Sequence, residues 1–426
     1  MKILMVHKFY YVEGGAERYV FNVTDLMKEK GHTVIPFAMR DDRNFSSDYS
    51  RFFADPFGPE QLFATHDPFK RLRIARDVIF NRHAQARLAS LIEETKPDIA
   101  HVHSVYHHLS PSVLFTLKKY NLPVMLTLHD YKIVCPNYIF LDGARQVCEE
   151  CRGRHFWKAT AKKCFRNSYA ASALVTAEAY WNYWKKSYLK NVDLFVSPSR
   201  FLADKVCQYG YQKKHVKVQP YTLDLRLYEP CHAASDYFVF MGRLTHEKGV
   251  HFLLDAAKKI RGADLLILGA GPIENELRQR VLKENLRHVK MVGYQSGAAL
   301  RDLVRQAKFT VVTSEWYDNS PLVIYESLAL GNPVIAARMG GIPELIEEGL
   351  DGFVYDRGDL ESFVAFANYL IQNPKRAREM GINARQKAER LYGFDQHYEK
   401  LLDLYNHTSA VASKNSRLPK DDLPLR

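Results

Sequence analysis

Two cations in the second half of the sequence are spaced to bind one diphosphate. An apolar run ends at Gly242, Arg243 follows it directly, and Lys248 lies five residues further on. Arg offers a planar fork of donors and Lys a compact charge, so the two can converge on a leaving group that departs with two negative charges. The alternative is a pair of surface cations beside a loop, partly neutralised by Glu247. We favour the diphosphate interpretation.

A polar loop downstream has the features of a second part of the same site. Residues 314–326 follow the apolar run 309–313, and a helix is expected to begin near Pro321. The free N–H groups of its first turn then point back toward the loop. Glu326 lies deeper in this helix, where a carboxylate can accept hydrogen bonds from two neighbouring hydroxyls. A ribose presents such a pair.

Glycines mark two further turns between a strand and a helix. Gly14 and Gly15 follow the first apolar run, where their backbone N–H groups can approach a phosphate. Gly269 and Gly271 follow a later run, and there a tight turn under close packing is the favoured interpretation. The pattern Gly-x-Gly-x-x-Gly is absent from both places. This argues against a dinucleotide-dependent oxidoreductase.

Four cysteines form a symmetric set around a Cys-x2-Cys pair. Cys135, Cys148, Cys151 and Cys164 are spaced Cys-x12-Cys-x2-Cys-x12-Cys. Disulfides are not expected in a reducing compartment, so the spacing predicts a structural zinc site with four thiolate ligands. An iron–sulfur cluster would use the same ligands. The remaining alternative is four ordinary cysteines, with His155 as a replacement ligand.

A basic, aromatic stretch follows the cysteines. Tyr180, Trp184 and Tyr188 recur at helical turns beside Trp181, with three lysines nearby. These lysines are Lys185, Lys186 and Lys190. Such a helix can rest on an anionic membrane, although packing against the domain core is favoured. Residues 60–220 also hold 25 Lys and Arg against 13 Asp and Glu, which accounts for the whole net charge of +12.

The elements that position these residues are short apolar runs separated by longer amphipathic stretches. The runs span residues 2–6, 32–37, 99–103, 124–128, 194–197, 237–241, 265–268, 309–313 and 333–336. This alternation predicts an α/β fold in which helices cover parallel sheets. We expect an N-terminal Rossmann-like domain at 1–220, a second domain at 221–393, a helix at 394–408 that completes the first, and a disordered tail at 409–426.

Composition sets the class of protein. The 426 residues suggest two domains, and 46% hydrophobic with 25% charged residues is typical of a globular protein. No apolar run reaches the roughly 18 residues of a membrane helix, and the N-terminus lacks the features of a signal peptide. We therefore expect a cytoplasmic protein, with the inner face of the membrane as an alternative location.

Taken together, these motifs resemble glycosyltransferase family 4, also known as glycosyl transferases group 1. The motifs are Gly-Gly-Ala-Glu-Arg from Gly14, Gly242-Arg243 with Lys248-Gly249, Gly-Ala-Gly-Pro from Gly269, and an acid-x7-Glu pair ending at Glu326. The resemblance covers residues 1 to about 406. It implies a GT-B fold, with two Rossmann-like domains facing across a cleft and the last helix crossing back to the first domain.

The resemblance also implies an activity. Family members retain the anomeric configuration of a hexose transferred from a nucleotide diphosphate sugar, here a UDP- or GDP-sugar. Arg243 and Lys248 would bind the diphosphate with Gly14, Gly15 and Gly242, and Glu326 would bind the ribose. Residues around the transferred sugar would be Asp318, Asn319, Ser320, Pro321 and Leu322. Asp318 departs from the family, which usually has Glu there, and Glu315 is an alternative contact.

No carboxylate pair can be placed on both faces of the anomeric carbon, so a front-face mechanism is expected rather than double displacement. The departing phosphate, stabilised by Arg243 and Lys248, would take the proton of the acceptor hydroxyl. An Asp-x-Asp metal site is absent from the sequence, so the cations would replace a divalent ion. The enzyme is therefore predicted to need no catalytic metal.

Histidines mark the expected acceptor side of the first domain. By resemblance His129 contacts the C6 hydroxyl of the donor sugar and assists catalysis, and the alternative is a strand-end histidine bonded to Asp130. Expected to line the acceptor side are His103, Ser104, Tyr106, His107 and His108. Neighbours on an extended chain point in opposite directions, which argues against a metal site among them.

The acceptor is expected to be a saccharide or a lipid-linked saccharide, as in polysaccharide biosynthesis, with peripheral contact to an anionic membrane as a possible accompaniment. Alternatives are a nucleotide-sugar epimerase or a sugar phosphorylase on the same fold. A nucleic-acid-binding protein that uses the basic surplus is a third, although no nucleic acid partner is expected.

Overall fold

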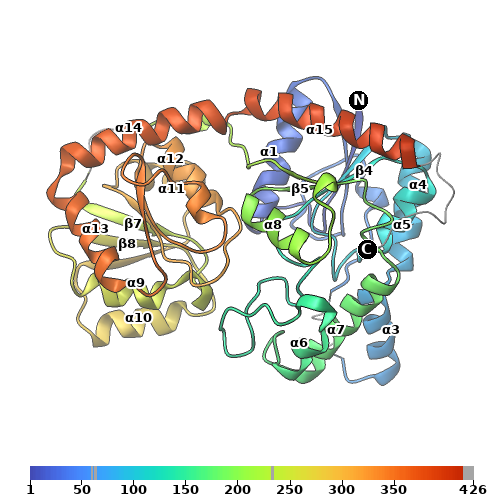
Figure 1. Cartoon of the computed structure of the whole chain (residues 1–426), viewed down its shortest axis with the longest axis horizontal. Coiled ribbons are helices and arrows are strands. Elements are labelled where there is room, and N and C mark those ends of the chain that lie inside the picture. Colours follow the sequence, from blue (N-terminus) through green and yellow to red (C-terminus); the bar gives the residue numbers. More distant parts are fainter. Residues whose placement is uncertain (59–60, 62–64, 232–234, 416–426) are drawn as a thin grey trace. The chain divides into compact units, whose positions relative to one another are not determined.

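The computed structural model describes residues 1–58, 61, 65–231 and 235–415 (Figure 1). It divides into two compact units, which we call unit 1 and unit 2. Unit 1 comprises Met1–Gln219 and the chain from Tyr398 onward, and unit 2 comprises Pro220–His397. Each unit is built on a six-stranded parallel sheet covered by helices, which confirms the predicted α/β fold.

Unit 1 has the strand order β2-β1-β3-β4-β5-β6. Its strands are β1 (Lys2–Val6), β2 (Thr33–Phe37), β3 (Ile99–Val102), β4 (Val124–Thr127), β5 (Leu194–Ser197) and β6 (Val216–Val218). Its helices are α1 (Gly15–Glu29), α3 (Pro68–Ile79), α4 (Arg82–Thr95), α5 (Ser112–Lys119), α6 (Trp157–Ala161), α7 (Tyr169–Trp184) and α8 (Arg200–Gln208), with most of α15 (Phe394–Asn415). The strands β3, β4 and β5 are buried throughout, as expected for strands covered on both faces.

Unit 2 has the strand order β12-β11-β10-β7-β8-β9. Its strands are β7 (Tyr237–Met241), β8 (Asp264–Leu268), β9 (Val289–Gly293), β10 (Thr310–Val312), β11 (Val334–Ala337) and β12 (Gly352–Tyr355). Its helices are α9 (Val250–Ala257), α10 (Glu274–Lys283), α11 (Gly297–Arg305), α12 (Leu322–Ala329), α13 (Leu360–Gln372) and α14 (Pro374–Leu391). Short 3₁₀ turns connect elements in both units at Ser50–Phe52, Arg152–Arg154, Lys213–His215, Leu225–Leu227, His246–Lys248 and Ile342–Glu344.

The strand orders locate a switch point in each sheet. In unit 1 the chain runs from β1 to β2 on one side and then returns to β3 on the other side of β1. In unit 2 it runs from β7 through β8 and β9, and returns to β10 on the other side of β7. Ligands of open parallel sheets bind outside the carboxyl ends of the strands at such points. The loops after β1, β3, β7 and β10 are therefore where a site is expected.

The last helix differs from its predicted extent. We expected it to end at residue 408, but α15 continues to Asn415, so residues 409–415 are helical rather than a disordered tail. Within unit 1, Tyr398 Oη lies 3.0 Å from His32 Nε2 and Tyr405 Oη lies 2.9 Å from His101 Nδ1. These contacts anchor the helix. The rest of the predicted tail, residues 416–426, lies outside the described residues.

No helix in the described ranges is long and apolar enough to cross a membrane.

Candidate active site

The loops at the switch point of unit 2 bring Lys248 and Asp318 together. Lys248 Nζ lies 2.6 Å from Asp318 Oδ2, and Ser314 Oγ donates to the same oxygen at 3.0 Å. The Lys248 ammonium also lies 5.4 Å from the centroid of the Trp316 ring. Asp318 is buried, whereas Lys248 is partly exposed. The predicted diphosphate cation and the predicted sugar-binding acid thus meet at one place.

Two glycines allow this close approach. A Cβ on Gly249 would lie 1.8 Å from the carbonyl oxygen of Thr313, and one on Gly340 would lie 2.2 Å from that of Asp318. Both residues also have positive φ, 69° and 64°. A side chain at Gly249 would push the loop after β7 away from Thr313, and one at Gly340 would push the loop after β11 away from Asp318. These glycines therefore fix the position of Lys248 against Asp318.

The turn at Gly269 is a tight turn under close packing, which is the interpretation that its sequence favoured. A Cβ on Gly269 would lie 1.9 Å from the carbonyl oxygen of Gly242, and one on Gly271 would lie 2.3 Å from that of Leu244. The turn after β8 therefore packs directly on the turn after β7. Arg243, between these two contacts, has an exposed side chain that forms no ion pair with a residue in the described ranges.

Glu326 is buried in α12 and has a partner that the sequence did not indicate. Tyr228 Oη donates to Glu326 Oε1 at 3.2 Å. Tyr228 precedes the strands of unit 2 in an irregular segment, so no periodic pattern marks it. A tyrosine hydroxyl beside the carboxylate fixes its rotamer while leaving Oε2 for other contacts of this side chain.

The first turn of α12 begins as expected. Pro321 is the N-cap residue, and no side-chain hydrogen bond caps this end of the helix. Asn319, Ser320 and Leu322 are buried beside it. Ser320 Oγ lies 2.7 Å from Tyr325 Oη, which holds the loop onto the helix. The positive end of α12 is therefore presented by a fixed loop rather than a mobile one.

In unit 1, Gly14 and Gly15 start α1 at the carboxyl end of β1. Gly14 N donates to Glu17 Oε2 at 2.9 Å, which is the glutamate half of a capping box. The other oxygen of Glu17 lies 3.4 Å from His7 Nε2. A buried carboxylate thus ties the glycine turn to the end of β1.

His129 is half-buried and stacks on the buried His103. His129 Nε2 lies 2.9 Å from His103 Nδ1, and the two rings stack with centroids 5.2 Å apart. Burial, with the nearby charges of His7 and Lys8, lowers the pKa of His129 to about 3. His129 is therefore neutral at pH 7 and suited to exchange a hydrogen bond with a hydroxyl.

The carboxylate of Asp130 accepts hydrogen bonds from residues other than His129, which was its partner in the alternative interpretation. Tyr106 Oη donates to Asp130 Oδ2, and Lys132 N donates to Oδ1 at 2.9 Å. Burial raises the pKa of the Asp130 carboxyl.

The residues predicted for the acceptor side separate into two groups. Tyr106 and His108 are half-buried at the end of β3, whereas His103, Ser104 and His107 are buried. His107 Nε2 lies 3.1 Å from Glu178 Oε2, which also pairs with Lys132 Nζ at 2.7 Å. Although burial opposes ionisation of Glu178, Lys132 and His107 outweigh it and lower its pKa to about 2. His107 thus joins a buried charge network rather than an acceptor surface.

The zinc site predicted for the four cysteines is not supported by the structure. All are free thiols, and in the described part of the chain no group of three or more His, Cys, Asp or Glu is arranged to hold a metal ion. Cys135 Sγ instead donates to Asn137 Oδ1 at 2.9 Å, and Lys162 Nζ lies 3.8 Å from Cys148 Sγ. Cys151 and Cys164 pack in an apolar cluster with Phe156. The four thiols nevertheless lie near one another, since burial, the larger cause, and then Cys135, Cys148 and Cys164 all raise the pKa of Cys151.

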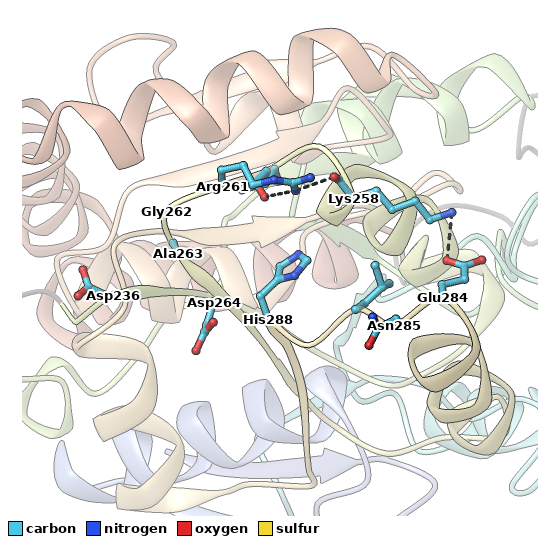
Figure 2. Close-up of a pocket in the computed structure, with 11 residues that line it drawn as sticks. Asp236, Lys258, Arg261, Gly262, Ala263, Asp264, Glu284, Asn285 and His288 are labelled. Carbon is cyan, nitrogen blue, oxygen red and sulfur yellow. Dashed lines mark hydrogen bonds and ion pairs between the residues drawn. The ribbon is translucent and has the colours of Figure 1, made fainter.

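A pocket elsewhere in unit 2 has no role in this site. It lies at the amino ends of β7, β8 and β9, opposite to the loops described above, and Figure 2 shows its polar side chains. Lys258 Nζ already pairs with Glu284 Oε2 at 3.0 Å, and His288 Nε2 lies 2.8 Å from the Ala257 carbonyl oxygen. Its polar groups therefore bind one another.

Comparison with known proteins identifies the relatives of this chain. Residues 13–227 match the model of "Glycosyltransferase Family 4", and residues 232–387 match that of "Glycosyl transferases group 1". The chain is 25% identical over 362 residues to a 42.6 kDa protein in the cps region of Klebsiella pneumoniae, which covers 81% of this chain and 87% of that protein.

Two solved structures share the fold. Sucrose-phosphate synthase from Thermosynechococcus elongatus has a TM-score of 0.70 and 19% identity, covering 96% of this chain and 99% of that one. Anabaena HepE, solved in complex with UDP-glucose, has a TM-score of 0.63 and 17% identity, covering 98% of this chain and 100% of that one.

Proposed function

Since the chain belongs to glycosyltransferase family 4 and has the GT-B fold, we propose that it transfers a hexose from a nucleotide diphosphate sugar to a saccharide hydroxyl with retention of configuration. The acceptor is a saccharide or a lipid-linked saccharide. The enzyme works in the cytoplasm and needs no divalent metal.

The contact between Lys248 and Asp318 carries the proposal. It joins a cation and a buried acid at the switch point of unit 2, which is where open parallel sheets bind their ligands. A diphosphate sugar has both groups that such a pair recognises, namely a dianionic phosphate and sugar hydroxyls. On binding, Lys248 exchanges part of its contact with Asp318 for the diphosphate, and the freed carboxylate oxygen accepts from a hydroxyl.

Charge stabilisation by this unit promotes departure of the nucleotide. As the bond between the anomeric carbon and the diphosphate oxygen breaks, negative charge grows on the phosphate. Arg243, Lys248 and the amino end of α12 stabilise that charge. The acceptor oxygen attacks on the same face and gives its proton to the departing phosphate, so the configuration is retained.

The remaining residues bind and orient the donor. Glu326 accepts hydrogen bonds from the ribose, with Tyr228 holding its carboxylate. Backbone groups of Asn319, Ser320 and Leu322 surround the sugar. In unit 1, Gly15 presents its backbone N–H group to the diphosphate beside Gly14, whose own N–H is bonded to Glu17. Neutral His129 contacts the C6 hydroxyl.

The comparisons support a donor and a pathway class. The HepE complex with UDP-glucose favours a UDP-sugar, with a GDP-sugar as the alternative. The relative from the cps region favours an acceptor in the synthesis of a surface polysaccharide.

A donor screen tests this proposal. UDP- and GDP-sugars are compared for thermal stabilisation, and the best donor is then incubated with the enzyme in EDTA while NMR follows the anomeric proton of the released or transferred sugar. The proposal predicts hydrolysis or transfer with retention in EDTA. An inverted product would refute the mechanism, and loss of activity in EDTA would refute metal independence.

A further inference from the structure

One end of unit 1 exposes large aromatic side chains that the site does not use. Trp157 in α6 is 55% exposed and Trp184 at the end of α7 is 69% exposed. Figure 1 shows α3, α6 and α7 gathered at this end of the unit. Exposed tryptophans are rare on soluble surfaces without a partner, and clusters of them mark interaction sites.

The two tryptophans belong to one continuous patch, because both flank Tyr180. The Trp184 ring stacks on that of Tyr180 with centroids 5.4 Å apart and an interplanar angle of 24°. The Tyr180 hydroxyl in turn lies 3.3 Å from the backbone N of Trp157. We call Trp157, Tyr180 and Trp184 the aromatic patch.

The cysteine-containing segment holds this patch in place. Cys151, Phe156 and Ala159 form a small apolar cluster, against which Tyr180 and other side chains of α7 pack. Phe156 meets the Tyr180 ring edge-on at 5.2 Å. The segment thus fixes α6 on α7 and sets the start of α6 beside Tyr180.

Positive charge surrounds the aromatic patch. Residues 151–190 contain nine Lys and Arg and a single acid, Glu178, which is fully buried. Arg154 lies over the Tyr183 ring at 4.6 Å, and Lys185 lies over the Trp181 ring at 5.1 Å. In the described ranges neither cation forms an ion pair. The surface therefore combines aromatic rings with a rim of cations, of which Lys158 and Lys162 pair with Glu150 whereas Arg154 and Lys185 form no ion pair in the described ranges.

The neighbouring helix α3 also combines exposed apolar side chains with basic residues. The end of α3 contacts α7 through Phe80 and Trp181, whose rings meet edge-on at 6.3 Å. Phe69 and Leu72, in the first half of α3, are 83% and 71% exposed. Lys70, Arg71 and Arg73 lie among them in the sequence.

We infer that the aromatic patch and its basic rim dock unit 1 onto an anionic lipid bilayer. Trp and Tyr prefer the depth of the lipid headgroups, and Lys and Arg are attracted to the negative charge of the surface. The exposed Phe69 and Leu72 enter the same interface. A protein partner would require matching acids, and a second copy would bring the same cations face to face.

Vesicle flotation of the full-length protein tests this inference. Vesicles of phosphatidylcholine alone are compared with vesicles that also contain phosphatidylglycerol, at low and high salt. We expect the protein to float only with the anionic vesicles, and to be released by salt because the Debye length shortens. Protein that stays in the soluble fraction with anionic vesicles at low salt would overturn the inference.

Substitutions distinguish vesicle binding through the aromatic patch from vesicle binding through positive charge alone. W157A/W184A should reduce the bound fraction at least tenfold, while L282A/Y294A, which removes exposed side chains from unit 2, should leave it unchanged. Hydrolysis of the donor without vesicles reports folding and should be the same in all proteins. Equal vesicle binding by W157A/W184A and wild type would contradict the inference. A dimer in ultracentrifugation that dissociates only in W157A/W184A would also contradict the inference, because it would assign the patch to a second copy of the chain.

Discussion

The ammonium of Lys248 lies 2.6 Å from the carboxylate of Asp318, across the two loops that leave β7 and β10. The acid-x7-Glu motif has Asp at this position, and the shorter side chain reaches the lysine because Gly249 lets the loop after β7 pack directly on Thr313, at the end of β10. The pair holds both side chains in place before any ligand arrives. The loss of side-chain conformational entropy on ligand binding is therefore smaller.

Asp318→Asn tests this pair. The amide keeps the shape but removes the charge, so Lys248 is held less firmly and the hydroxyl contact weakens. We expect kcat/KM to fall roughly 10- to 100-fold, the range for a hydrogen bond to a charged group. Steady-state kinetics with the preferred donor measure this. Asp302→Asn, at an exposed surface ion pair, is the matched control, and an equal loss in both variants would contradict the role of Asp318.

Tyr228→Phe tests the support of the ribose carboxylate. Removing only the hydroxyl leaves Glu326 in place but frees its rotamer, so the donor KM should rise about 5- to 20-fold with little change in kcat. Glu326→Ala should abolish turnover. Replacing the donor by its 2′-deoxyribose analogue should raise KM less in Tyr228→Phe than in wild type. An equal rise of KM in both proteins would count against this assignment.

Buried histidines predict a stability that falls in mild acid. Burial lowers the pKa values of His7 and His129 to about 3, so the folded protein stays unprotonated there while the unfolded chain binds protons below about pH 6.5. The apparent Tm should therefore drop between pH 7 and pH 5, since protons bind the unfolded state.

His129→Gln should make this drop shallower, because one proton fewer is taken up on unfolding. His83→Gln, which replaces a half-exposed histidine, should leave the slope unchanged. Calorimetry across this pH range measures both. An identical slope in wild type and His129→Gln would show that His129 is not a buried neutral group.

The buried pair of Lys132 and Glu178 predicts a large structural effect. Glu178→Ala leaves the Lys132 ammonium buried without its carboxylate, which costs about 3–5 kcal/mol and lowers the apparent Tm by roughly 6–20 °C. The double substitution Lys132→Met with Glu178→Leu should restore most of the stability that Glu178→Ala loses. Asp264→Asn, which breaks the exposed pair with Lys290, should shift Tm only slightly, and a larger effect there than at Glu178 would refute this account.

The strands at the centre of each sheet were predictable from sequence, but three edge strands were not. β6, β9 and β12 lie at sheet edges and were not predicted. In β6 and β9 most residues are partly or fully exposed, so they lack the continuous apolar run of a strand covered on both faces. The missed strands do not carry the candidate site.

Within the site, sequence patterns identified residues near glycines and helix starts, but not their partners. Tyr228 was missed because its segment has no periodicity. The exposed aromatic surface of α7 was predicted in part, since Trp184 is exposed whereas Tyr188 is buried. Trp157 was missed because it reaches this surface only through the packing of α6 on α7. The cysteine spacing correctly placed four thiols near one another, but the zinc predicted for them is not supported.

Calorimetric titration of UDP and GDP into wild type, Arg243→Ala and Lys248→Ala tests the central claim most directly. The account predicts that one diphosphate binds wild type and that each substitution weakens it at least tenfold. Lys258→Ala, in the pocket at the opposite end of the strands, should bind as tightly as wild type. Unchanged affinity in both Arg243→Ala and Lys248→Ala would contradict a donor site on the loops after β7 and β10.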